Sequence, residues 1–136
     1  MSLVIDASVA LKWVLNEAGS DDADALLTEE LIAPSLWLLE AANALWRRAQ
    51  RGEITQDEAR ERLDEFFNTP LTSIPIEDDL AEAAALAALL DHPVHDCLYL
   101  ALAIRENAQV VTADRRFHAA AERATVTRGR VRLLSG

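Results

Sequence analysis

The alternation of short apolar runs with helical segments constrains the fold of this chain more than any other feature. Leu3-Val4-Ile5 is rich in β-branched residues and ends on Asp6, and residues 7–13 follow with helical three-and-four spacing. This pattern predicts a buried strand, a carboxylate at its carboxyl end, and then a helix. We expect that helix to extend to about Asn16.

The same order of strand followed by helices recurs along the chain. Further strands are expected at residues 31–33, 71–76, 109–112 and 131–134, and further helices over 35–50, from 55 onward, and over 77–90, 96–104 and 115–123. This order predicts an α/β fold with right-handed crossovers, a three-layer α/β/α sandwich around a mostly parallel central sheet. A chain of 136 residues suffices for one domain with its own core, so we expect residues 1–136 to form a single domain.

Local signals add detail to these elements. Ser20 is an expected N-cap, Thr55 and Glu58 form an expected capping box, and Pro75 suggests that its strand lies at a sheet edge. In the helix over 35–50, several residues share one face through three-and-four spacing. These are Leu36, Leu39, Ala42, Asn43 and Trp46.

Composition limits the partners of the chain. Thirteen Lys and Arg against 23 Asp and Glu give a net charge of −10, which disfavours nucleic-acid binding by bulk electrostatics. Any nucleic acid would need a local basic patch or a bridging cation. Cys97 is the only cysteine, so no internal disulfide can form and a buried apolar role is expected. We expect no signal peptide and no membrane span, and therefore a cytoplasmic location.

Four acids depart from the usual pattern of charges on solvated helix faces. Asp6 ends an apolar strand, Glu40 lies within an apolar helical stretch, Asp96 begins the most apolar helix, and Asp114 follows the strand over 109–112. Parallel strands place Asp6 and Asp114 at the same sheet edge. The crossover helices bring Asp96 and Glu40 towards that edge as well.

Four converging carboxylates raise one another's pKa values and need a cation to stay ionised. No Arg or Lys lies beside Asp6, Glu40 or Asp96 in sequence, although Lys12 and Arg115 are near enough to reach in. An all-oxygen site suits Mg²⁺ or Mn²⁺ better than zinc. As an alternative, the three aspartates could each cap a helix, but this explanation is not available for Glu40.

At this point the residues resemble the PIN-domain ribonucleases, and among these the VapC toxins of bacterial toxin–antitoxin pairs. The resemblance covers essentially the whole chain and rests on four segments in order. They are Val4-Ile5-Asp6-Ala7-Ser8, Glu40 with Asn43 and Ala44, Asp96 with Tyr99, Ala101 and Ala103, and Val111-Thr112-Ala113-Asp114.

The resemblance implies a metal-dependent endoribonuclease that acts as the toxin of such a pair. It implies that Asp6, Glu40, Asp96 and Asp114 are catalytic and bind one or two Mg²⁺ or Mn²⁺ ions. It further implies that the hydroxyls of Ser8 and Thr112 support the acids or the metal water, and that Asn43 matches a polar neighbour of the helix acid. An RNA substrate, a cognate antitoxin that inserts a segment into the active-site groove, and a homodimer are the implied partners.

Other residues allow two interpretations each. The arginines near the expected site either contact RNA or form plain surface salt bridges; they are Arg47, Arg48, Arg51, Arg115, Arg116, Arg128, Arg130 and Arg132. Trp13, Trp37 and Trp46 either pack in the core or line a groove for a partner. His92, His95 and His118 are not expected to be ligands, although His95 is adjacent to Asp96.

Two other function classes are compatible with parts of the pattern. A phosphoacceptor or phosphohydrolase could use Asp6 as its nucleophile, but such sites need a second acid beside it and a Lys near the last strands, and Lys12 is the only lysine. A non-catalytic PIN-like module that only binds partners is the other class. Its site is expected to have lost an acid, whereas all four are present here.

Overall fold

The computed structural model describes residues 2–135 and contains one five-stranded sheet in which all neighbouring strands are parallel. In chain order the strands are β1 (Ser2–Ile5), β2 (Glu30–Pro34), β3 (Leu71–Ile74), β4 (Gln109–Thr112) and β5 (Val131–Leu133). Their spatial order is β3-β2-β1-β4-β5. The predicted fold class is therefore confirmed, and β3 lies at an edge as Pro75 suggested.

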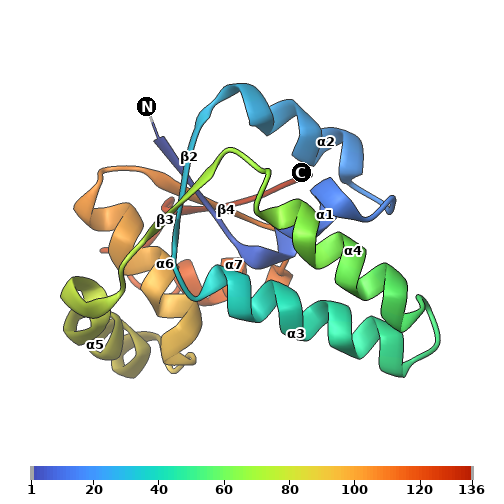
Figure 1. The fold of residues 1–136 in the computed structure, drawn as a ribbon. Coiled ribbons are helices and arrows are strands. Elements are labelled where there is room, and N and C mark those ends of the chain that lie inside the picture. Colours follow the sequence, from blue (N-terminus) through green and yellow to red (C-terminus); the bar gives the residue numbers. More distant parts are fainter. Residues whose placement is uncertain (1, 136) are drawn as a thin grey trace.

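Helices cover both faces of this sheet, as Figure 1 shows. They are α1 (Ala7–Val14), α2 (Ser20–Asp24), α3 (Trp37–Gln50), α4 (Gln56–Phe66), α5 (Leu80–Leu90), α6 (Val94–Arg105) and α7 (Arg115–Ala121), with 3₁₀ turns at Ala25–Thr28 and Glu77–Asp79. From β1 to β3 the chain moves outward in one direction, and from β4 to β5 it moves in the other. Right-handed crossovers therefore put α1–α4 on one face and α5–α7 on the other.

The core centres on β1 and α6. Val4 and Ile5 of β1 are fully buried, and every residue from Cys97 to Ala103 of α6 is buried. Trp37 and Phe66 pack edge to face, with ring centroids 5.4 Å apart. Burial of Cys97 agrees with its expected apolar role. Within residues 2–135, no helix combines the length and apolarity needed to cross a bilayer.

Several helix boundaries differ from the sequence predictions: α5 begins at Leu80 after a 3₁₀ turn, α6 begins at Val94, α7 ends at Ala121, and the starts or ends of α1, α2 and α3 differ as well. Helix α1 ends at Val14 instead of Asn16, because Leu15 is extended. Gly19 occupies the N-cap position of α2 with a left-handed φ of 89°, so Ser20 was wrongly predicted as the cap. Its hydroxyl instead donates to the carbonyl of Leu15. Helix α3 begins at Trp37, two residues later than predicted.

The apolar face of α3 that spacing suggested is not its core face. The buried residues of α3 are Trp37, Ala41 and Leu45, whereas Leu39 is 73% exposed and Trp46 is 54% exposed. Of Trp13, Trp37 and Trp46, only Trp37 has a fully buried side chain and belongs to the core. Periodicity correctly grouped residues on a common face, but it could not say which side of the helix meets the sheet.

Candidate active site

The candidate site lies where the carboxyl ends of β1 and β4 meet. These two strands are neighbours, and the chain leaves them towards opposite edges of the sheet. Such a switch point leaves a crevice beyond the strand ends, because the two connecting segments diverge. Asp6 directly follows β1, and Asp114 lies two residues beyond β4.

Asp6 is nearly buried, with 7% of its surface exposed. Its Oδ2 accepts hydrogen bonds from Ser8 Oγ at 2.6 Å and Thr112 Oγ1 at 2.7 Å. Both hydroxyls accept backbone N–H groups, from Ala113 and Asp114 respectively, so their own protons are directed at Asp6. Although Asp6 occupies the N-cap position of α1, its side chain makes no capping hydrogen bond.

The pKa of Asp6 is raised above its usual value, chiefly by burial. The hydrogen bonds from Ser8 and Thr112 oppose this rise, and the negative charges of Asp96 and Asp114 add to it. Both hydroxyls donate to the same oxygen, and no hydrogen-bond donor within residues 2–135 reaches Oδ1. Asp6 therefore keeps one carboxylate oxygen available to a ligand.

Glu40 projects from the first turn of α3. Its Oε1 accepts a hydrogen bond from Tyr99 Oη at 2.6 Å, and its Oε2 lies 3.9 Å from His95 Nε2. Burial raises the pKa of Glu40 to about 7 against the opposing effect of the Tyr99 hydrogen bond, and the charges of Asp6 and Asp96 raise it further. The sequence suggested that Glu40 lies in the middle of its helix. Because α3 begins later than predicted, Glu40 lies in the first turn instead.

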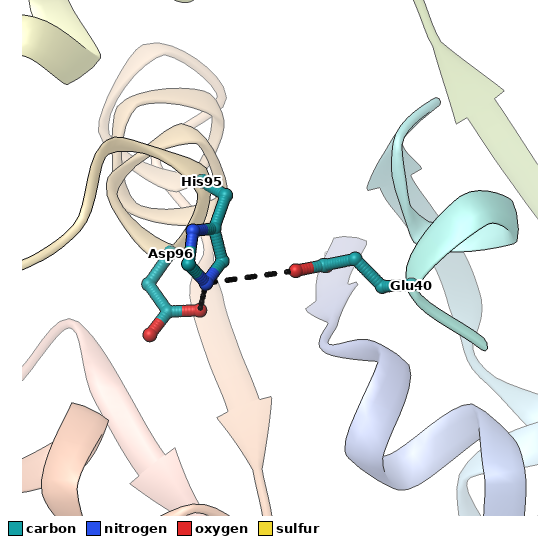
Figure 2. A group of neighbouring side chains, drawn as sticks. All are labelled: Glu40, His95 and Asp96. Carbon is teal, nitrogen blue, oxygen red and sulfur yellow. Dashed lines mark ion pairs between the residues drawn. The ribbon is translucent and has the colours of Figure 1, made fainter. Parts of the chain in front are cut away.

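Asp96 lies in the first turn of α6, opposite Glu40. Its carboxylate contacts two histidines, His92 Nε2 at 2.7 Å and His95 Nε2 at 3.5 Å, while Pro93 occupies the N-cap position. Figure 2 shows Glu40 pointing from α3 towards His95 and Asp96. One potential ligand atom from each of these three residues lies within 4.8 Å of the others.

Of the three aspartates among the four acids, only Asp114 caps a helix with its side chain. Its Oδ1 accepts the backbone N–H of Arg116 at 2.9 Å and of Phe117 at 3.4 Å, at the start of α7. The capping alternative therefore applies to Asp114 but not to the side chains of Asp6 and Asp96. Within residues 2–135, Oδ2 of Asp114 accepts no hydrogen bond and remains available to a ligand.

One pocket of about 220 Å³ brings all four acids together. Ser8, Arg47 and His95 also line it, whereas Thr112 is buried behind Asp6. Asn43 is exposed and lines an adjoining hollow of about 590 Å³ that shares Glu40, Arg47 and His95 with the pocket. A second hollow, of about 500 Å³, adjoins the pocket through Asp96 and Asp114.

Comparison with known proteins identifies the family of this fold. Residues 3–123 match the PIN domain. The chain belongs to the PIN-domain family. Ribonuclease VapC3 of Pyrobaculum aerophilum is 34% identical over 119 residues, which cover 85% of this chain and 91% of that protein. Ribonuclease VapC9 of Mycobacterium tuberculosis is 32% identical over 114 residues, covering 84% and 87% respectively.

Solved structures share the fold of this PIN domain at lower sequence identity. The crystal structure of PAE2754 from Pyrobaculum aerophilum superposes with a TM-score of 0.74 at 22% identity, covering 98% of this chain and 84% of that one. The Mycobacterium tuberculosis toxin VapC20, described as cleaving the sarcin–ricin loop, superposes with a TM-score of 0.68 at 17% identity, covering 87% and 94%.

The PIN-domain pocket has the chemistry of a site for a hard divalent cation. Within residues 2–135, the four acids form ion pairs only with the histidines His92 and His95, and none with Arg or Lys. Converging carboxylates without a strong cationic partner are costly unless they bind a cation or a proton. Mg²⁺ and Mn²⁺ prefer such oxygen ligands.

The basic residues near this PIN-domain site fall into two groups. Lys12 does not reach the acids, because its Nζ donates to Glu17 at 2.9 Å and to the carbonyl of Ala18 at 2.7 Å. Arg48 also pairs with Glu17, at 2.9 Å. By contrast, Arg47 lines the four-acid pocket and Arg116 lines the hollow beside Asp114. Arg115 borders a separate hollow with Lys12.

Sequence reasoning missed the hydrogen-bonding roles of Tyr99 and His92. Tyr99 follows Asp96 by three residues in α6, so the two share a side of the helix. His92 lies just before α6 and is near Asp96 in sequence. The His92 ring also stacks on Phe117, with centroids 5.7 Å apart. The spacing to Asp96 was the available signal, but the contact of Tyr99 with Glu40 required the packing of α3 against α6.

Proposed function

We propose that this chain is a metal-dependent endoribonuclease and the toxin of a toxin–antitoxin pair. The observation that carries the proposal is the single pocket lined by Asp6, Glu40, Asp96 and Asp114. Membership of the PIN-domain family and the ribonuclease names of relatives at 32–34% identity support it.

In the proposed reaction, a water oxygen forms a bond to phosphorus while one phosphodiester P–O bond breaks and the departing oxygen takes up a proton. The four acids would hold Mg²⁺ or Mn²⁺, which would supply positive charge to acidify the attacking water and stabilise the phosphate oxygens. Ser8 and Thr112 fix the orientation of Asp6 through Oδ2. One of the acids would accept the proton that the attacking water loses.

The basic residues beside the acids give the substrate a place to bind despite the net charge of −10. Arg47 and Arg116 are exposed, and neither forms an ion pair within residues 2–135. They line hollows on the α3 side and the α7 side of the acid pocket. We propose that they contact the phosphates that flank the cleaved bond, because guanidinium groups bind phosphate through paired hydrogen bonds.

Cognate antitoxin binding is a further part of the proposal. Leu36 and Leu39 line the hollow next to Glu40, and Leu39 is 73% exposed. An apolar segment bound there would cover the opening to the acids. The substitution Leu39→Ala removes apolar surface without adding a charge beside Arg47, and it is expected to weaken antitoxin binding while RNA is still cleaved.

We also propose that the chain forms a homodimer. Sedimentation of the purified chain would test this.

A cleavage assay on the purified chain, free of any antitoxin, tests the enzymatic proposal. RNA is expected to be cut with Mg²⁺ or Mn²⁺ present, left intact with a chelator, and left intact by Asp96→Asn. If the folded wild-type chain cuts no RNA with either metal, a non-catalytic partner-binding module becomes the better explanation. A phosphoacceptor role for Asp6 is disfavoured because Lys12 pairs with Glu17, away from the pocket.

A further inference from the structure

Tyr99 places a hydroxyl group inside the most apolar helix of the molecule. Its side chain is fully buried, and the other buried residues of α6 are Cys97, Leu and Ala. Its Oη donates to Glu40 Oε1 at 2.6 Å, and the backbone of Ala7, directly after Asp6, also forms a hydrogen bond with it. A buried hydroxyl is costly without partners, so these contacts hold the Tyr99 hydroxyl beside Glu40.

The contact also determines which oxygen of Glu40 faces the pocket. With Oε1 bound to Tyr99, Oε2 is the atom that lies 3.9 Å from His95 Nε2. Glu40 is on α3 and Asp96 is on α6, so the Tyr99 hydroxyl links the two helices that supply these acids. A glutamate has three rotatable side-chain bonds, and holding one of its oxygens reduces the freedom of the other.

We propose that Tyr99 is a positioning residue that orients Glu40 for cation binding and thereby sets the affinity of the pocket for a divalent ion. This inference rests on the proposed function, because it assigns Glu40 to the metal site. Outer hydrogen bonds to ligating carboxylates commonly change metal affinity by about 10–100-fold. Tyr99 suits the role because its hydroxyl is fully buried, donates to Glu40 and lies between the two helices that supply Glu40 and Asp96.

The substitution Tyr99→Phe tests the proposal, because it removes the hydroxyl and keeps the ring that packs in the core. Isothermal titration of Mn²⁺ into the RNA-free protein is expected to give a dissociation constant about tenfold higher than that of the wild type. At saturating Mn²⁺, the KM for RNA is expected to stay unchanged. Thermal melting with and without Mn²⁺ provides a second readout, in which the stabilisation by the metal becomes smaller.

Thr127→Val is a matched control for the loss of a buried hydroxyl. Thr127 is also fully buried, and its Oγ1 donates to the carbonyl of Ala121 at 2.6 Å, but it does not line the acid pocket. This variant is expected to melt at a lower temperature than the wild type and to bind Mn²⁺ equally well. A purely structural role for Tyr99 would give the same result for Tyr99→Phe and would overturn the inference.

A double substitution shows whether Tyr99 acts through Glu40. Glu40→Asp keeps the charge but draws the carboxylate back from the Tyr99 hydroxyl by one methylene. In that background, Tyr99→Phe is expected to leave Mn²⁺ affinity unchanged, whereas a full tenfold loss would overturn the proposed route. If the wild type binds Mn²⁺ but Tyr99→Phe binds it equally, the inference alone fails. If the wild type binds no Mn²⁺, the proposed metal-dependent function fails with it.

Discussion

Asp6 and Asp79 are two almost equally buried carboxylates with opposite surroundings. They are 7% and 6% exposed. Asp79 receives two hydrogen bonds of 2.8 Å from the guanidinium of Arg105, one at each oxygen. Asp6 receives two hydroxyl hydrogen bonds at one oxygen and shares its pocket with three other acids.

The difference between the two sites separates a structural acid from a candidate catalytic one. The charge of Asp79 is balanced within the protein by a bidentate ion pair, so its carboxylate contributes to stability. Within residues 2–135, the Asp6 carboxylate has no Arg or Lys partner, and its Oδ1 accepts no hydrogen bond. Burial alone therefore does not identify a functional acid; the absence of a matched cation does.

The largest expected effect is on catalysis when an acid of the pocket is neutralised. Asp6→Asn keeps an oxygen that can accept the bonds from Ser8 and Thr112, but it removes the charge needed for a metal. RNA cleavage is expected to fall about a thousandfold or more, because several kcal/mol of transition-state stabilisation are lost. Initial rates on a labelled RNA measure this loss.

The same variant is expected to be at least as stable as the metal-free wild type, because repulsion from Asp96 and Asp114 is relieved. Urea unfolding without metal measures this difference. A large loss of stability in Asp6→Asn would mean that Asp6, like Asp79, serves the fold.

Asp79→Asn is expected to show the opposite behaviour. Removing one partner leaves Arg105 without its bidentate acceptor, and a loss of about 2 kcal/mol in the free energy of unfolding follows. This value is below that for a fully buried pair, because the Arg105 side chain is 45% exposed. Urea unfolding measures the loss, and Mn²⁺ affinity is expected to match the wild type. Weaker Mn²⁺ binding would contradict the distinction between the two acids.

The pH dependence of stability offers a third test, through Glu40. Its pKa in the folded, metal-free protein is raised from 4.5 to about 7, so the folded state holds the proton more tightly than the unfolded state. The free energy of unfolding is therefore expected to decrease as pH rises from 4.5 to 7. Glu40 contributes roughly 1–3 kcal/mol to this decrease, allowing for solvent screening.

Glu40→Gln isolates that contribution. Urea unfolding at several pH values, with a chelator present, is expected to give a flatter profile for the variant than for the wild type. Identical profiles would show that Glu40 titrates near its ordinary pKa, as an exposed glutamate does, and would remove one difference between the pocket and the protein surface.

The smallest expected effect concerns Arg47, which lines the same pocket as Asp6 without pairing with it. Arg47→Ala is expected to raise the KM for RNA about three- to tenfold and to reduce the salt dependence of binding, because one phosphate contact is lost. Arg51→Ala is the matched control, since Arg51 is exposed at the end of α3 and borders none of the site hollows. Equal effects of both variants would assign Arg47 to general surface charge.

The sequence alone determined the order of elements, the parallel sheet and the four acids. Alternating apolar runs and helical spacing are local properties, so residues 3–6 already predicted a buried strand ending in Asp6. Parallel strands then fixed Asp6 and Asp114 at one edge, which is a consequence of topology. The assignment of these acids as catalytic stays a prediction, as does the single-domain boundary at residues 1–136.

Only the tertiary structure decided how each acid is held. Helix α3 turns Trp37, Ala41 and Leu45 into the core and leaves Leu39 outside, a choice that depends on the neighbouring helices and not on the spacing along α3. The contact of Tyr99 with Glu40 joins residues 59 positions apart. Side-chain hydrogen bonds of this kind depend on distances between packed elements, which one-dimensional patterns do not contain.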